Sequence, residues 1–229
     1  MSPAQSNNGL PTEQQEKPRI VILISGSGSN MVAIADAVTR GDIDAEIAAV
    51  VCNKAEAPGV QKAKDRDIET QVINHNEFAS REDFDTALMQ QIDQYQPDLV
   101  ILAGFMRILT PAFVIRYHGR MLNIHPSLLP KYQGLNTHQR VLDAGDEQHG
   151  VTVHFVTEEL DGGPNVIQAM VPVYDGDDIT SLRQRVHTQE HVIYPIAVKW
   201  FVSGRLSMKG NQALLDDTLL PASGLPLSN

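Results

Sequence analysis

Apolar runs of strand length alternate with segments of helical spacing along most of this chain. The runs are continuous rather than alternating, which is the pattern of central parallel strands that are covered on both faces. They predict strands at Arg19–Ile24, Glu46–Cys52, Glu69–Asn74, Asp98–Gly104 and Arg120–Ile124.

Helix signals lie between these strands. The apolar positions of residues 31–38 recur at the spacing of one helix face. Ser80 and Asp83 have the spacing of a capping box that opens a helix, and Thr110 followed by proline predicts another helix start. Two closing helical segments are expected from about Ile179 to Phe201.

The stretch HGVTVHFVT, residues 149–157, alternates instead, as expected for a strand with one wetter face. Residues 166–173 are expected to pair with it across a turn at Asp161–Asn165. No further hydrophobic pattern follows Gly204.

The whole pattern predicts one α/β domain. We expect a mostly parallel, Rossmann-like doubly wound sheet of about seven strands, with helices on both faces, over residues 19–220. Residues 1–18 are expected to form a disordered leader, and residues 221–229 a flexible tail.

Composition narrows the possible partners. A chain of 229 residues that is 42% hydrophobic can bury one substantial core. Its net charge of −10 disfavours binding to nucleic acid or to an anionic membrane, whereas one loop can still bind a small phosphorylated metabolite.

Cys52 is the only cysteine, which excludes an intrachain disulfide and a thiolate metal cluster, and we interpret it as a small buried hydrophobe. Without a secretion signal or a membrane span, we expect a cytoplasmic protein.

Ligands of such sheets bind beyond the carboxyl ends of the strands, so the loops at those ends carry the candidate chemistry. ISGSGSN, residues 24–30, follows the first strand and opens a helix, where free N–H groups favour an anion. A dinucleotide-binding fingerprint would have glycine at position 31 and an acidic residue near position 53. This chain has Met31 and Asn53 there, so the loop does not match that fingerprint. A phosphate monoester site and a purely structural turn both stay open for this loop.

NIHPSLLP, residues 123–130, follows another strand of the same sheet, and Asp161 lies in a third loop. An amide, an imidazole and a carboxylate suit addition to a carbonyl. In that interpretation Asn123 stabilises the oxyanion, His125 moves protons, and Asp161 favours the protonated imidazole. Each also has a structural interpretation: a strand-end cap, a histidine bonded to nearby backbone and a turn aspartate. No spacing indicates a serine nucleophile or a catalytic metal.

Five ordered motifs together resemble the phosphoribosylglycinamide formyltransferases, folate-dependent enzymes of purine synthesis. The motifs are ISGSGSN, LAGFMRIL, NIHPSLLPKYQG, HGVTVHFVTEELDGGP and TQEHVIYP, and the resemblance covers roughly Arg19 to Leu220. It implies transfer of a formyl group from 10-formyltetrahydrofolate, as co-substrate, to the amine of 5-phosphoribosylglycinamide. The implied partners are small-molecule substrates, with no metal, in a monomer or homodimer.

The resemblance also implies roles for individual residues. The catalytic residues would be Asn123, His125 and Asp161. The ribonucleotide would be bound by Gly28, Ser29, Asn30, His187, Thr188, Gln189 and Glu190. The folate would be bound by Arg81, Met106, Arg107, Ile108, Leu109, Asn123, Thr157, Glu158, Glu159, Leu160 and Asp161. The chain departs from the family pattern at Gln133, usually proline, and at Asn136, commonly histidine.

Three other functions compete with this one. A 10-formyltetrahydrofolate hydrolase shares the catalytic trio but resembles this core with a regulatory domain in front, where this chain has 18 mostly polar residues. A methionyl-tRNA formyltransferase would add a basic C-terminal domain. A nucleotide-binding module without catalysis would explain the glycine loop and leave NIHPSLLP unexplained.

Overall fold

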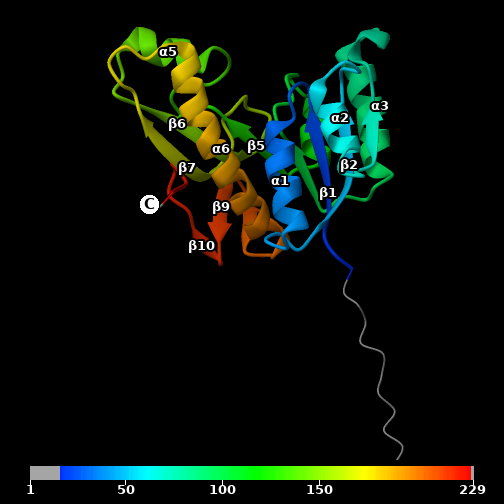
Figure 1. The fold of residues 1–229 in the computed structure, drawn as a ribbon. Coiled ribbons are helices and arrows are strands. Elements are labelled where there is room, and N and C mark those ends of the chain that lie inside the picture. Colours follow the sequence, from blue (N-terminus) through cyan, green and yellow to red (C-terminus); the bar gives the residue numbers. More distant parts are fainter. Residues whose placement is uncertain (1–15, 228–229) are drawn as a thin grey trace, which may run out of the picture.

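An eight-stranded sheet runs through the computed structural model, which describes residues 16–227 (Figure 1). Its strand order is β11-β7-β6-β5-β4-β1-β2-β3. The strands are β1 (Arg19–Ile24), β2 (Glu46–Cys52), β3 (Thr70–Val72), β4 (Leu99–Leu102), β5 (Met121–His125), β6 (Gln148–Phe155), β7 (Asn165–Pro172) and β11 (Leu225–Pro226). Only the β5–β6 and β6–β7 pairs are antiparallel, so the predicted mostly parallel sheet is confirmed.

Helices cover both faces of this sheet, as predicted. They are α1 (Ser29–Thr39), α2 (Pro58–Lys64), α3 (Arg81–Asp93), α4 (Pro111–Arg116), α5 (Thr137–Ala144) and α6 (Ile179–Val202), with a 3₁₀ turn at His75–Glu77. One core packs under α1, α2, α5 and α6, and the other under α3 and α4. Neighbouring residues of one strand enter different cores: Ile22 faces the first and Leu23 the second. Burial on both sides explains the continuous apolar runs.

The predicted caps form, and one helix differs from the prediction. Ser80 Oγ accepts a hydrogen bond from Asp83 N at 3.0 Å, and Thr110 caps α4 with proline at its first turn. The last two helical segments are instead the single helix α6, which contains Pro195. Proline removes one N–H donor from a helix. Here fully buried residues on both sides of Pro195, among them Tyr194, anchor α6 to the core and keep it continuous.

The alternating residues 149–157 were predicted to form a strand with one wetter face. The strand exists as β6, but the wetter face does not. Every residue of the strand after Gln148 is buried. The polar positions Thr152 and His154 are 0% and 2% exposed, because they contact other polar groups of the protein instead of water. Buried polar side chains of this kind are held by hydrogen bonds, which makes them candidates for function.

The chain after Gly204 contains structure that the apolar pattern does not predict. A three-stranded antiparallel sheet consists of β8 (Leu206–Lys209), β9 (Gln212–Leu215) and β10 (Thr218–Leu219). Residues 225–226 then pair with β7 as β11, so this part of the expected flexible tail belongs to the sheet.

Three further observations concern the chain ends, membrane-spanning helices and Cys52. Residues 1–15 and 228–229, most of the expected leader and the end of the expected tail, lie outside the described residues. None of the helices in residues 16–227 is both long and apolar enough to cross a membrane. Cys52 is fully buried, as predicted.

Candidate active site

The candidate residues gather where β1, β4 and β5 end. These three strands are neighbours in the sheet, and the chain order reverses at β1, which pairs with β2 on one side and β4 on the other. Such a switch point is where α/β sheets bind ligands. The glycine loop follows β1, the LAGFMRIL segment continues from β4, and the NIHPSLLP loop begins in β5.

His125 and Asp161 lie together at this rim, as the sequence predicted. Nδ1 of His125 is 3.3 Å from Oδ2 of Asp161, and the two side chains are 7% and 8% exposed. Nε2 of His125 is 2.9 Å from the carbonyl oxygen of Tyr132. Both ring nitrogens therefore face oxygen acceptors, and only the doubly protonated imidazolium can donate to both.

Asp161 is itself held in place. Its Oδ2 also accepts a hydrogen bond from Gly134 N at 2.9 Å, and its carbonyl oxygen accepts one from Gln133 Nε2 at 3.2 Å. Its φ of 49° lies in the left-handed region, where a non-glycine residue needs support from its surroundings. The loop after β5 thus positions the carboxylate as well as the imidazole.

His154 is a site residue that the sequence interpretation missed. It stands opposite Asn123 in the β5–β6 pair. Its Nδ1 is 2.9 Å from the Phe155 carbonyl oxygen, so the ring proton lies on Nδ1. Nε2 is then an acceptor for the Asn123 amide, whose Nδ2 donates to it at 3.1 Å. Burial lowers the pKa of His154 well below its ordinary value, so this ring stays neutral. The polar positions within the alternating β6 pattern were the available signal.

A cavity of about 130 Å³ opens beside Asn123 and Asp161. Two chain segments that the resemblance assigned to folate binding, residues 107–109 and 157–161, line this cavity. Its lining includes Asn123, Arg107, Ile108, Leu109, Thr157, Glu158, Glu159, Leu160 and Asp161, together with His154. The cavity therefore brings Asn123 and Asp161 together with most of the folate candidates, and His125 is connected to it through its contact with Asp161.

Two folate candidates lie apart from this cavity. Arg81 is 3.7 Å from Glu82 at the exposed start of α3 and does not line the cavity. Met106 is outside the lining as well, with 66% of its surface exposed. Arg107 does line it, with its guanidinium 4.9 Å from the ring centre of Phe84.

The ribonucleotide candidates come together from α1 and α6, which lie side by side (Figure 1). Ser29 Oγ is 2.7 Å from Nε2 of His187, and Asn30 Nδ2 donates to Glu190 Oε2 at 2.7 Å. Oδ1 of Asn30 is buried without a partner in the described part of the chain. Residues about 160 positions apart thus form one polar cluster at the glycine loop.

The two residues between His187 and Glu190 point elsewhere. Thr188 Oγ1 donates to Gln184 O within α6, and Gln189 lines a separate hollow beside Met170. A helix places residues three apart on one face and the two between them on other faces. Of the four predicted residues of α6, only His187 and Glu190 therefore contact the glycine loop.

Gly28 has a structural requirement of its own. Its φ is +69°, and a Cβ there would lie 2.7 Å from the Cα of Gly59 in α2. The structural interpretation of this loop thus holds at Gly28, whatever the loop binds. Lys62, which the sequence interpretation did not include, donates from Nζ to Ser27 O at 2.9 Å and adds a positive charge beside the loop.

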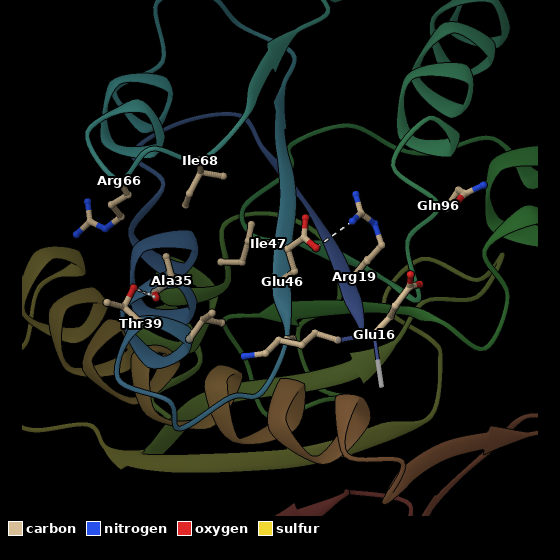
Figure 2. Close-up of a pocket in the computed structure, with 12 residues that line it drawn as sticks. Glu16, Arg19, Ala35, Thr39, Glu46, Ile47, Arg66, Ile68 and Gln96 are labelled. Carbon is tan, nitrogen blue, oxygen red and sulfur yellow. Dashed lines mark hydrogen bonds and ion pairs between the residues drawn. The ribbon is translucent and has the colours of Figure 1, made fainter. Parts of the chain in front are cut away.

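A larger hollow of about 710 Å³ lies elsewhere (Figure 2). It is lined in part by the amino ends of β1 and β2, where a guanidinium nitrogen of Arg19 lies 2.9 Å from Glu46 Oε2. Parallel sheets of this type bind ligands at the carboxyl ends of their strands, so this hollow is not the candidate site.

Within residues 16–227, no group of three or more His, Cys, Asp or Glu side chains is arranged to hold a metal ion.

Comparisons with known proteins show which family this chain belongs to. The family model "Formyl transferase" matches residues 18–198. The chain is 55% identical over 205 residues to the phosphoribosylglycinamide formyltransferase of Escherichia coli (strain K12), covering 90% of this chain and 97% of that protein. A solved phosphoribosylglycinamide formyltransferase from Coxiella burnetii is similar with a TM-score of 0.89 and 50% identity, covering 93% of this chain and all of that one.

A more distant structure shares the fold alone. A formyltetrahydrofolate deformylase from Pseudomonas syringae pv. tomato is 24% identical with a TM-score of 0.82, and the match covers 87% of this chain and 66% of that one. The family match covers most of the chain, and the relatives are matched over nearly their full length. This chain belongs to the formyl transferase family.

Proposed function

We propose that this protein transfers the formyl group of 10-formyltetrahydrofolate to the amine of 5-phosphoribosylglycinamide, a reaction of purine biosynthesis. The observation that carries the proposal is the 3.3 Å contact between His125 and Asp161, whose carboxylate lines the same cavity as Asn123. Relatives with names that state this activity, 55% and 50% identical over most of the chain, support it.

The chemistry starts with direct attack and needs no covalent enzyme intermediate. The amine nitrogen bonds to the formyl carbon, and the carbonyl electron pair moves onto oxygen. The Asn123 amide has one N–H committed to His154 and a second that can donate to this oxyanion. The charged ring of His125 adds to the stabilisation of the oxyanion.

Collapse of this intermediate needs a proton in the right place. The oxygen lone pair reforms the carbonyl and the bond from carbon to N10 of the folate breaks. N10 takes a proton from His125, and the attacking nitrogen passes its extra proton to the now neutral ring, directly or through water, so the protons balance and His125 is charged again. Asp161 favours the charged ring of His125 that makes this delivery possible. For delivery through Nε2, the bond to Tyr132 O must give way to the substrate.

The other substrate fits the polar cluster at the start of α1. Backbone N–H groups at a helix start attract a phosphate, and Lys62 adds a positive charge. Glu190, which accepts from Asn30, supplies the kind of carboxylate that bonds sugar hydroxyls. We assign Ser29, Asn30, His187 and Glu190 to the ribonucleotide, and residues 107–109 and 157–161 to the folate.

A formyl-transfer assay with and without the acceptor tests the proposal. Purified protein with 10-formyltetrahydrofolate should form formylated glycinamide ribonucleotide, and folate turnover should need the acceptor. Turnover that ignores the acceptor would instead indicate a hydrolase. We keep a cytoplasmic location, a metal-free reaction and a monomer or homodimer as predictions.

A further inference from the structure

The backbone between Gly104 and Leu109 has few bonds of its own. This stretch continues from β4 and borders the cavity beside Asn123. Within residues 16–227, its N–H and C=O groups take part in no backbone–backbone hydrogen bond. An irregular segment of this kind needs other contacts to keep one conformation.

Two buried side chains supply those contacts. Ser25 Oγ accepts a hydrogen bond from Met106 N at 2.8 Å, and Asp85 Oδ2 accepts one from Thr110 N at 2.6 Å. Ser25 is 4% exposed and Asp85 is 1% exposed, so water does not compete for these bonds. The segment is therefore tied near both of its ends by side chains rather than by a neighbouring strand.

The residue before Asp85 adds a third contact. Phe84 is fully buried in α3, and the guanidinium of Arg107 lies over its ring. Holding the segment through side chains leaves the N–H and C=O groups of residues 107–109 free for a ligand. The polar edge of a flat pterin ring offers donors and acceptors that such backbone groups can match.

We propose that Asp85 is a positioning residue for the formyl donor, because it holds residues 106–109 in the conformation that binds the folate. The inference rests on the proposed function, from which it takes the ligand of this segment. A bond from an N–H group to a carboxylate is charge-assisted and stronger than a neutral one. Oδ1 of Asp85 is buried without a hydrogen-bond partner in the described residues. Burying a carboxylate in this way is costly, and the cost is understandable where function requires it.

Replacement of Asp85 separates positioning from stability. Asp85→Ala removes the acceptor of Thr110 N, so the KM for 10-formyltetrahydrofolate should rise about tenfold. The KM for the ribonucleotide and kcat should stay within about threefold of wild type, because Asp85 contacts neither the glycine loop nor the catalytic trio. Asp85→Asn keeps a carbonyl acceptor and should restore the donor KM to within about threefold.

Asp93→Ala is the matched control. Asp93 lies on the same helix and also joins α3 to α4, accepting from Tyr117 OH at 3.0 Å and from Arg116, without touching residues 104–110. It should lower the melting temperature and leave the donor KM unchanged. If Asp85→Ala does not fold, Ser25→Ala removes the other tie and should raise the donor KM about as much. Ser25 belongs to the glycine loop, so for this variant only the donor KM is compared.

Two results would overturn the inference. A wild-type donor KM in Asp85→Ala, or in Ser25→Ala should the first variant not fold, contradicts positioning while formyl transfer stands. An equal rise in the KM of both substrates in Asp85→Ala contradicts it as well, since it indicates general loosening. A wild-type protein that transfers no formyl group removes the proposed function and this inference together.

Discussion

Nδ1 of His125 lies 3.3 Å from Oδ2 of Asp161, and both side chains are more than nine-tenths buried. The same carboxylate has its other oxygen 3.8 Å from Nε2 of His154. One aspartate thus stands between a ring whose two nitrogens face acceptors and a ring that burial keeps neutral. In the mechanism that we propose, His125 transfers protons and His154 orients the Asn123 amide.

Asp161→Asn tests what the carboxylate does for His125. The amide keeps the shape and removes the charge that favours the imidazolium. The proposed mechanism uses the charged ring of His125 to deliver a proton, so kcat should fall and the shape of the pH–rate profile should change. The profile of kcat against pH for both proteins measures this.

Asp146→Asn is the control for that experiment. Asp146 accepts from Lys131 Nζ and Tyr132 OH at 2.9 Å each, so it ties down the same loop without touching His125. Its profile should keep the wild-type shape. If Asp161→Asn also keeps that shape and only loses stability, Asp161 is a turn residue.

His154 is expected to act through Asn123. His154→Phe keeps a ring and removes the Nε2 acceptor that holds the amide, so kcat should fall about tenfold. In an Asn123→Ala background the same change should cost much less, because the amide is already absent. A double-mutant cycle on kcat measures this coupling. Independent, additive losses would show that His154 serves another purpose.

The pair His138 and His149 predicts a stability that depends on pH. Their rings meet at 3.0 Å, from Nδ1 to Nε2, and burial, the largest cause, lowers the pKa of each to about 4. Unfolded histidines titrate near ~6.5, so the unfolded chain binds more protons in the window between these values. Stability should therefore be complete above about pH 6.5 and fall as the pH drops towards about 4.

Urea unfolding across that pH window measures the effect. His138→Gln removes one of these rings and should make the free energy of unfolding less dependent on pH, while buried His154, whose pKa is also lowered, still contributes. An unfolding free energy that is flat across the window in the wild-type protein would contradict the assignment.

The ribonucleotide site predicts a contrast between neighbouring residues. Ser29→Ala removes a hydroxyl that contacts His187, so it should raise the ribonucleotide KM about tenfold without changing the folate KM or the melting temperature. Gly28→Ala forces a side chain against Gly59 at positive φ, so it should also lower the melting temperature. Steady-state kinetics with thermal unfolding separates the two. A Ser29→Ala variant that raises the KM of both substrates equally would refute the assignment.

The sequence predicted the features that depend on local pattern. Strands buried on both faces are continuous apolar runs, and Ser80 and Thr110 cap the helices that follow them. The two helical segments expected from about Ile179 to Phe201 are one helix, because tertiary packing compensates for the hydrogen bond that Pro195 costs, and such packing is not a local property of the sequence.

What the sequence did not predict depends on short elements and on pairing. The strands after Gly204 have only two to four residues each, too few for an apolar pattern. The available signal was the turn residues between them. Gly210, Asp216 and Asp217 are residue types that tolerate the positive φ that these turns require. His154 was missed because its role depends on standing opposite Asn123, and only the register of β5 and β6 establishes that.

The central claim is that Asn123 and His125 carry out formyl transfer at this rim. The most direct test is kcat for acceptor-dependent formyl transfer in Asn123→Ala and His125→Ala, with circular dichroism to confirm folding. His125 is 6% exposed and bonds Tyr132 O, so its variant should lose some stability and remain folded. Each variant should lose on the order of 10²-fold or more in kcat. A folded His125→Ala enzyme with wild-type turnover would contradict the mechanism.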